Sequence, residues 1–102
     1  MQNICSLGFM KSSTTQVLPL GQLVMTPGVQ AEVPPDDYLS ALQRHARGDW
    51  GNVSSGDKKL NDEALTEGTR VLSSYEGGNN VKFWIITEAD RSVTTILLPE
   101  EY

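Results

Sequence analysis

The clearest strand pattern of apolar and polar positions lies in the last third of the chain. Residues 81–88 are rich in aromatic and β-branched side chains, and residues 70–75 and 93–98 also have the character of strands. The segments between them, 77–80 and 89–92, have the composition of turns. This part of the chain is predicted to form a three-stranded antiparallel meander.

A short apolar run precedes the meander and leads into a helix signal. Residues 20–25 predict a strand, and Thr26 followed by Pro27 is typical of a helix that begins with proline at its first position. The prolines at 34–35 end this helix after one or two turns, because proline restricts the residue before it.

A longer helix is predicted next. Asp36 at its start suits the positive end of the helix dipole, and Gly48 is expected to end it in a left-handed conformation. Tyr38, Leu42 and His45 fall on one face at helical spacing. This semi-apolar stripe is expected to pack against the rest of the domain.

A third helix is predicted from a serine N-cap at 54–55 to Gly68, with Leu60, Ala64 and Leu65 at helical spacing. The fold class is therefore predicted as α+β. We expect a short N-terminal strand and two or three helices packed on the C-terminal three-stranded antiparallel meander.

A chain of 102 residues can bury one hydrophobic core but not two. Residues 1–18 show no period that persists, so we expect a flexible leader followed by a single domain over 19–102. No stretch has the apolar length of a membrane span or a signal peptide. Because the one cysteine, Cys5, cannot form an internal disulfide, the expected location is the cytoplasm.

The charge balance and the missing motifs narrow the function. Eight Lys and Arg against 13 Asp and Glu give a net charge of −5, which disfavours indiscriminate binding to nucleic acid. The sequence contains no phosphate-binding loop, dinucleotide fingerprint, nucleophile elbow or zinc-binding spacing. We therefore expect no cofactor, no metal and no membrane. The expected partner is another protein or a second copy of the chain.

His45 is the only side chain whose ordinary pKa lies near neutrality. One interpretation makes it a cation at a helix C-terminus, stabilised by the dipole and bonded to nearby backbone. The other makes it a general acid or base, with Arg91, Thr94 and Thr95 supporting a developing negative charge. The first interpretation is favoured, because helix ends commonly hold such cations.

Two turns contribute the other candidate residues. In the turn at 89–92, Arg91 is expected to pair with Asp90, with anion binding by an exposed guanidinium as the alternative. Trp50 lies in a turn beside Gly51 and is expected to pack into the core. The candidate partner-binding residues are Arg44, Asp49, Trp50, Asp90 and Arg91.

Neighbouring residues in a strand point to opposite faces of the sheet. Phe83 and Trp84 are therefore expected to face opposite ways, as are Thr94 and Thr95. Two large aromatic side chains on opposite faces suggest that both faces are covered. We expect helices on one face and a partner, for example a second copy, on the other.

Several stretches carry a resemblance. The strings RHARGDWG at 44–51, RVLSSY at 70–75 and WIITEADRSVTTILLPEEY at 84–102, with Asn61 and residues 67–68, resemble a family of small bacterial proteins carried on plasmids and integrated elements. The resemblance covers about residues 20–102. It implies a role in a mobile genetic element and no defined activity.

Two functions are consistent with these observations. The first is a non-catalytic protein-binding or inhibitory module with an acidic surface; a structural subunit of a larger assembly is not distinguishable from it. The second, similar in outline to small toxin ribonucleases, is a metal-independent ribonuclease and the one case in which nucleic acid would be bound. There His45 would be the acid or base, Arg91 would bind the scissile phosphate, and Thr94 or Thr95 would assist. The absence of catalytic motifs favours binding.

Overall fold

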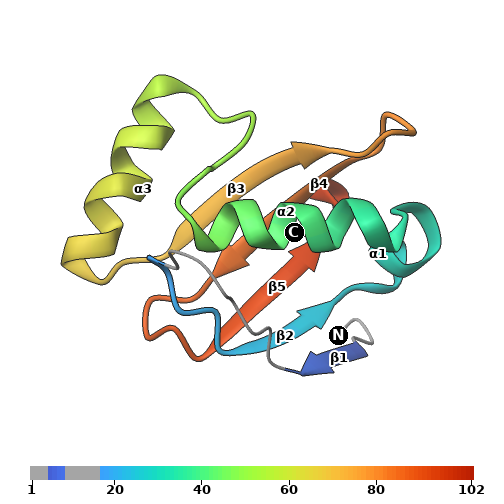
Figure 1. The fold of residues 1–102 in the computed structure, drawn as a ribbon, viewed down its shortest axis with the longest axis horizontal. Coiled ribbons are helices and arrows are strands. Elements are labelled where there is room, and N and C mark those ends of the chain that lie inside the picture. The colour runs from blue at the N-terminus through green and yellow to red at the C-terminus, as the bar shows by residue number, and fades with distance from the viewer. Residues whose placement is uncertain (1–4, 9–16) are drawn as a thin grey trace.

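The computed structural model describes residues 5–8 and 17–102 (Figure 1). The elements follow in the order β1 (Cys5–Gly8), β2 (Gln22–Met25), α1 (Pro27–Glu32), α2 (Pro35–Ala46), α3 (Ser55–Glu67), β3 (Val71–Glu76), β4 (Lys82–Thr87), β5 (Val93–Leu97) and the short 3-10 helix η1 (Pro99–Glu101). The predicted α+β fold class is confirmed, including the N-terminal strand β2, the helices and the C-terminal meander.

The five strands of the described residues form one sheet in the order β1-β2-β5-β4-β3. The pairs β3–β4 and β4–β5 are antiparallel, as predicted, whereas β2 lies parallel to β5. The pairing of β2 with β5 runs from Gln22 opposite Val93 to Met25 opposite Ile96. The last strand of the chain is therefore an interior strand of the sheet, with a neighbour on each side.

Helices α1 and α2 lie over one face of the sheet (Figure 1). The predicted stripe on α2 is confirmed, because Leu42 and His45 are fully buried and Tyr38 packs against the core from a partly buried position. Gly48 follows the C-cap residue of α2 with a φ of 85°, the left-handed conformation predicted for it.

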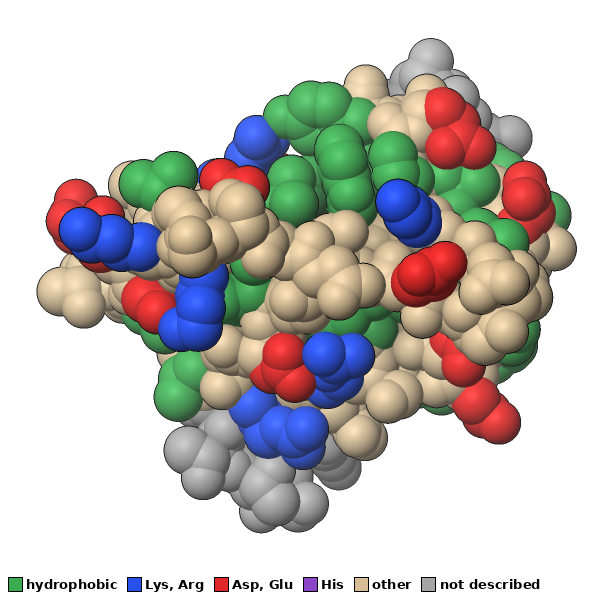
Figure 2. All heavy atoms as spheres, turned by 90° about the horizontal axis from the view of Figure 1, so that it is seen from above, with side chains coloured by type: hydrophobic (Ala, Val, Ile, Leu, Met, Phe, Trp, Pro, Cys, Tyr) green, Lys and Arg blue, Asp and Glu red, His purple; other side chains and the backbone are tan. Residues whose placement is uncertain are grey.

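The opposite face of the sheet, called here the outer face, carries the alternate residues of the same strands. Phe83 is buried under the helices, whereas Trp84 is partly exposed on the outer face. There its ring meets the ring of Tyr102 edge-on, with 5.7 Å between centroids. Hydrophobic side chains gather along the upper part of Figure 2, the side of the molecule away from α2. The predicted helix cover is confirmed on one face, and a partner on the other stays a prediction.

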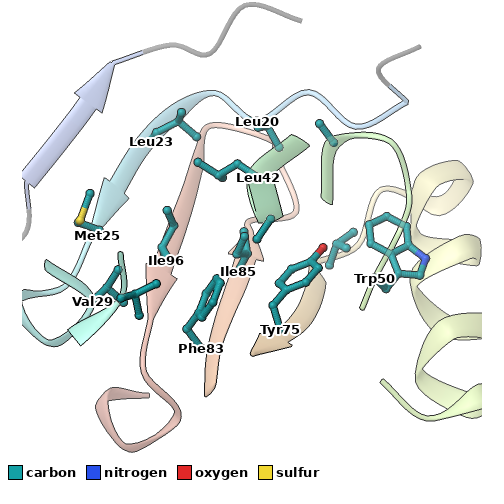
Figure 3. Packing of buried hydrophobic residues seen from close by; sticks show 14 of the residues in the cluster. Leu20, Leu23, Met25, Val29, Leu42, Trp50, Tyr75, Phe83, Ile85 and Ile96 are labelled. Atoms are coloured by element: carbon teal, nitrogen blue, oxygen red, sulfur yellow. The ribbon is translucent and has the colours of Figure 1, made fainter. Parts of the chain in front are cut away.

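The main hydrophobic core lies between the helices and the sheet (Figure 3). Phe83 and Ile85 from β4 and Ile96 from β5 are fully or almost fully buried beneath Leu42 of α2. Trp50 is also buried in this cluster, which confirms its predicted core position. The same cluster surrounds the polar groups described below.

Helix α3 begins and ends as predicted, but its buried face differs. The Ser54 hydroxyl accepts a hydrogen bond from Asp57 N at 3.1 Å, and Gly68 ends the helix with a φ of 74°. The helical spacing of Leu60 with Ala64 does not define this face, because Leu60 is 62% exposed while Ala64 and neighbouring Asn61 are buried. The reason is that α3 lies beside the edge strand β3, where backbone polar groups need partners that leucine cannot supply.

Strand β3 lies at the edge of the sheet, and polar contacts from other segments satisfy its outward-facing backbone groups. Asn61 Nδ2 donates to Leu72 O at 2.8 Å, and Leu72 N donates to Asn61 Oδ1 at 3.3 Å. Further along, Asn52 N donates to Ser74 O at 2.7 Å and Ser74 N donates to Trp50 O at 3.1 Å. An open edge is a template for pairing with another strand, and these contacts remove it at residues 72 and 74.

Residues before the predicted boundary of 19 contact the folded part of the chain. Leu18 is fully buried in the core, and the N–H groups of Val17 and Leu18 donate to Ala46 O at 2.9 and 3.2 Å. Within the expected leader, β1 pairs antiparallel with β2. The remainder of the predicted leader, 1–4 and 9–16, lies outside the described residues.

Replacing the Asn61 amide tests the edge closure. We expect Asn61→Leu to lower the free energy of unfolding by about 1–2 kcal/mol, because the N–H and C=O of Leu72 lose their partners. Asn52→Leu is the control, since Asn52 contacts β3 through its backbone, and should change it by less than about 0.5 kcal/mol. Urea denaturation followed by circular dichroism measures both. Equal losses would contradict the assigned role.

Candidate functional site

His45 lies in the last turn of α2 and is fully buried. Its Nδ1 is 2.5 Å from Ser73 Oγ, and its Nε2 is 2.8 Å from Thr87 Oγ1. The Thr87 hydroxyl is 2.7 Å from Thr94 Oγ1, which donates to Leu20 O at 2.7 Å. These five residues form a continuous polar chain through the core, called here the His45 network.

The direction of each hydrogen bond follows from the carbonyl end of the network. Because Leu20 O only accepts, Thr94 donates to it and must accept from Thr87. Thr87 has then used its proton and accepts from Nε2 of His45. Because burial keeps the ring neutral, Nδ1 carries no proton and accepts from the Ser73 hydroxyl. His45 is thus a neutral imidazole protonated at Nε2, with both ring nitrogens bonded.

The interpretation of His45 as a helix-end cation is wrong. Burial lowers the pKa of the imidazole to about 3, and the positive charge of Arg91 lowers it further. The ring bonds to hydroxyls of β3 and β4, and the edge-on ring of Trp50 lies beside it at 5.7 Å between centroids. A neutral ring in this setting gains nothing from the helix dipole.

Thr94 and Thr95 lie on opposite faces of the sheet, as predicted from the alternation of side chains along a strand. Thr94 is fully buried and belongs to the His45 network, whereas Thr95 is partly exposed on the outer face. Of the hydroxyls proposed for a catalytic set, the structure therefore brings Thr94 into the network and places Thr95 on the other side of the sheet. Thr87 and Ser73, which sequence analysis missed, complete the network, and their inward positions in β4 and β3 were the available signal.

Arg91 lies in the turn between β4 and β5 with a φ of 62°. Its Nη2 donates to Ala64 O at 2.8 Å and its Nη1 to Thr69 O at 2.7 Å. The expected pairing with Asp90 is wrong, because Asp90 instead accepts from the N–H and the hydroxyl of Ser92, at 3.0 and 2.6 Å. The guanidinium thus joins the β4–β5 turn to the C-terminal end of α3.

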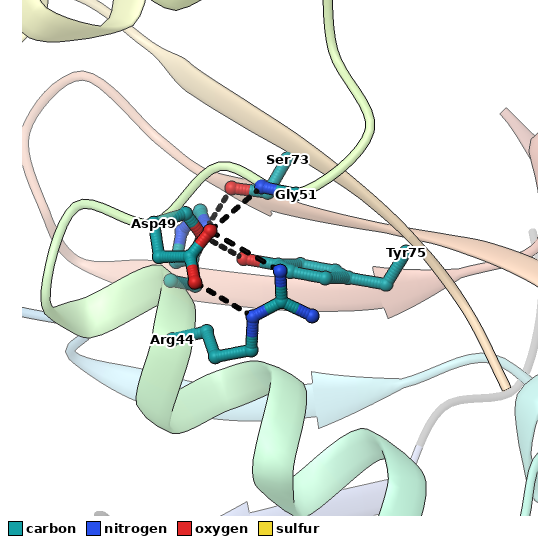
Figure 4. Close-up of polar contacts among 6 residues, drawn as sticks. Arg44, Asp49, Gly51, Ser73 and Tyr75 are labelled. Carbon is teal, nitrogen blue, oxygen red and sulfur yellow. Dashed lines mark hydrogen bonds and ion pairs between the residues drawn. The ribbon is translucent and has the colours of Figure 1, made fainter.

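Arg44 and Asp49 form an ion pair at the end of α2, with Nε to Oδ2 at 2.8 Å (Figure 4). The hydrogen bond from Arg44 lowers the pKa of Asp49 and raises that of the guanidinium. The Arg44 guanidinium also lies 5.0 Å from the ring centre of Tyr75, whose hydroxyl donates to Asp49 O at 2.6 Å. This cluster holds the turn that follows α2.

Trp50 and Asp62 connect that turn to α3. The indole N–H donates to Asp62 Oδ1 at 2.9 Å, and the same carboxylate pairs with Lys58 at 3.0 Å. The Trp50 ring is buried, so it does not present a face to a ligand. Its contacts stabilise the fold.

A hollow, called here the α3 hollow, lies between the first half of α3 and the outer face. It has two parts of about 370 and 210 Å³, and Asp57 and Leu72 line both. Trp84 of β4 lines the larger part, and Leu60 and Arg70 line the smaller. The hollow is an accessible surface, in contrast to the buried His45 network.

Within residues 5–8 and 17–102, no three or more His, Cys, Asp or Glu side chains lie close enough to share a metal ion. No helix in the same ranges combines the length and apolar character needed to cross a membrane.

The surroundings of His45 do not suit a general acid or base. A general acid or base must reach its substrate and have a pKa near the working pH. The His45 ring is fully buried, its pKa is about 3, and both nitrogens are bonded within the core. Arg91 directs its donors at backbone carbonyls. The arrangement is suited to holding α2 on the sheet.

The neutral state of His45 makes stability depend on pH. The unfolded chain binds a proton at His45 below about pH 6.5, whereas the folded chain keeps it neutral down to about pH 3. The contribution is complete above pH 6.5 and is lost as the pH falls toward 3. We expect about 2 kcal/mol less stability from this group at pH 5 than at pH 7. Urea unfolding from pH 4.5 to 7.5 should show it, and His45→Gln should flatten the slope. Parallel slopes would refute the assignment.

Breaking the network in the middle should be costly. Thr87→Val keeps the shape of the side chain but leaves Nε2–H of His45 without an acceptor and Thr94 without a donor. We expect the free energy of unfolding to fall by about 2–3 kcal/mol. Thr95→Val, on the outer face of the adjacent strand, is the control and should change it by less than about 0.5 kcal/mol. Thermal and urea denaturation measure both, and similar losses would argue against the network.

We compared the chain with known proteins at three levels. Neither protein-family models, nor curated proteins, nor solved structures gave a significant match. The resemblance to plasmid-borne proteins therefore stays a prediction from the sequence, and the proposal for function depends on the geometry of the described residues.

Proposed function

We propose that this protein is a non-catalytic protein-binding module, an accessory or inhibitory protein of a mobile genetic element that acts in the cytoplasm. The observation that carries this proposal is the state of His45. The one imidazole of the chain is fully buried, neutral and bonded at both nitrogens. Acid–base turnover would require the core to open, whereas binding requires no such change.

The surface supports the binding half of the proposal. Leu60 and Tyr102 are 62% and 64% exposed, and Trp84, whose ring contacts that of Tyr102, is partly exposed. Exposed apolar side chains next to polar ones are typical of interaction sites. A net charge of −5 favours a protein partner over nucleic acid. The connection to a mobile element comes from the resemblance of residues 44–51, 70–75 and 84–102.

Site-specific photo-crosslinking tests the proposal. A p-benzoylphenylalanine in place of Leu60 should give a crosslinked protein in bacterial cells, and an excess of the unmodified protein should suppress it. The same probe in place of Leu39, which is 42% exposed on α2, is the control and should not give that product.

A nuclease assay on the purified protein completes this test. We expect RNA to stay intact with the wild-type chain. RNA fragments that appear with the wild type and disappear with His45→Gln would establish the ribonuclease alternative and overturn the proposal. The absence of any specific crosslink at position 60 would also count against it.

A further inference from the structure

We propose that the α3 hollow and the outer face beside it bind a second copy of the chain about a twofold axis. In this contact Leu60 of each copy enters the larger part of the other copy's hollow, called here the recess, and Arg70 of each copy pairs with Asp57 of the other. The inference goes beyond the proposed function, because it assigns the chain itself as an occupant of the surface. A partner protein and a second copy would compete for it.

The surface carries an apolar projection beside an apolar recess. Leu60 is 62% exposed, because α3 is attached to β3 through the neighbouring Asn61. The recess has a volume of about 370 Å³, and its lining includes Trp84, Leu72 and Val53. Leu60 lines the smaller part of the hollow and not the recess, so it leaves the recess of its own copy open. The leucine of a second copy would bury apolar surface there.

The charges that line the hollow are of both signs and are not paired with each other. Asp57 and Arg70 both line the smaller part, yet within the described ranges neither forms an ion pair. Arg70 is held in place by Tyr102, whose hydroxyl accepts from its guanidinium at 2.7 Å. A surface with one charge of each sign can be complementary to itself, because a twofold rotation brings each carboxylate to the other copy's guanidinium.

The lysines next to Asp57 do not change this balance. Lys58 forms an ion pair with Asp62 at 3.0 Å. Lys59 lies about 200° around the helix from Asp57 and therefore on the opposite side of α3. The hollow thus presents one carboxylate and one guanidinium to an incoming surface.

A single placement of the second copy satisfies both contacts. Asp57 lines both parts of the hollow, so it lies beside the recess that receives Leu60. Arg70 lines the same smaller part as Leu60. When Leu60 of one copy enters the recess of the other, Arg70 of that copy is therefore brought toward Asp57 of the other.

The rest of this side favours a contact between faces. Glu76 lies opposite Lys82 in the register of β3 and β4, so the charges on the outer face balance there as well. The outward backbone groups of Leu72 and Ser74 are satisfied within the chain, so two copies cannot extend one sheet at these positions. Repulsion between the net charges of −5 is largely screened beyond about 8 Å at physiological salt.

The size of the surface predicts a weak dimer. Hydrophobic side chains gather on this side of the molecule (Figure 2). Strands β3 to β5 and one side of α3 offer roughly 500 Å² per copy. Specific interfaces begin near about 600 Å² per partner, so the contact lies near the lower limit and the dimer should dissociate readily.

Sedimentation equilibrium of the full chain tests for the dimer. We expect a reversible monomer–dimer equilibrium with a Kd on the order of 10–100 µM in about 0.15 M salt. Leu60→Ser should raise this Kd by about fivefold or more, because it removes the side chain that fills the recess. Leu39→Ser, at an exposed leucine of α2, is the matched control and should leave the Kd unchanged.

Charge reversal tests the reciprocal pairing. Asp57→Arg gives a surface with two positive side chains, and Arg70→Asp gives one with two negative side chains. Each variant alone should associate with itself at least about tenfold more weakly than the wild type, because like charges would face each other. An equimolar mixture of the two should associate within about fivefold of the wild type, since every aspartate then meets an arginine. Both positions are exposed, so each variant should keep the circular dichroism spectrum of the wild type.

Three results would overturn the inference. The first is a monomer at about 0.5 mM. The second is a dimer whose Kd is unchanged by the variants at 57, 60 and 70. The third is a mixture of the charge variants that associates no better than either alone. These results leave the proposed function standing, because the crosslink from position 60 tests it separately. A crosslinked product with the mass of two copies would support the dimer, whereas a product that contains another protein would support the proposed function.

Discussion

The buried imidazole of His45 is held by hydroxyl groups from two strands, and through Thr94 the same chain of bonds reaches a third. These bonds are directional, so they fix the position of α2 over the sheet more narrowly than apolar packing alone would. They also fix the register of the strands. A shift of β4 by one residue would turn Thr87 toward the outer face and leave the ring without an acceptor.

Polar side chains also hold the periphery of the domain. Asn61 joins α3 to β3, and Arg91 joins the end of α3 to the β4–β5 turn. Near η1, the Glu101 carboxylate accepts from the Thr26 hydroxyl and from Gly28 N, where a side chain in place of glycine would collide with it. Because α3 is held largely by such polar contacts, not all of its apolar residues are buried in the core, and Leu60 stays exposed. The exposed wall of the α3 hollow is a result of this division.

The accuracy of the sequence predictions follows the range of the interactions involved. The strands of the meander and the glycine that ends α2 depend on local composition, so they were predicted correctly. The parallel pairing of β2 with β5 joins segments about 70 residues apart. The sequence pattern within either segment does not indicate which strand it pairs with. The burial of Asn61, the contacts of Arg91 and the neutral state of His45 likewise depend on groups supplied by distant elements. A lone histidine near a helix end has the same sequence signature in both protonation states.

The one-way order of protons in the core limits how this sequence can change. The hydroxyls of Ser73, Thr87 and Thr94 each donate a hydrogen bond to the next group of the network. Losing any of them would leave a buried polar atom without a hydrogen-bond partner. An apolar residue at position 45 would become acceptable only after the hydroxyls had gone, and every intermediate would be less stable. In divergent relatives the four positions 45, 73, 87 and 94 should therefore either persist as a set or be exchanged together.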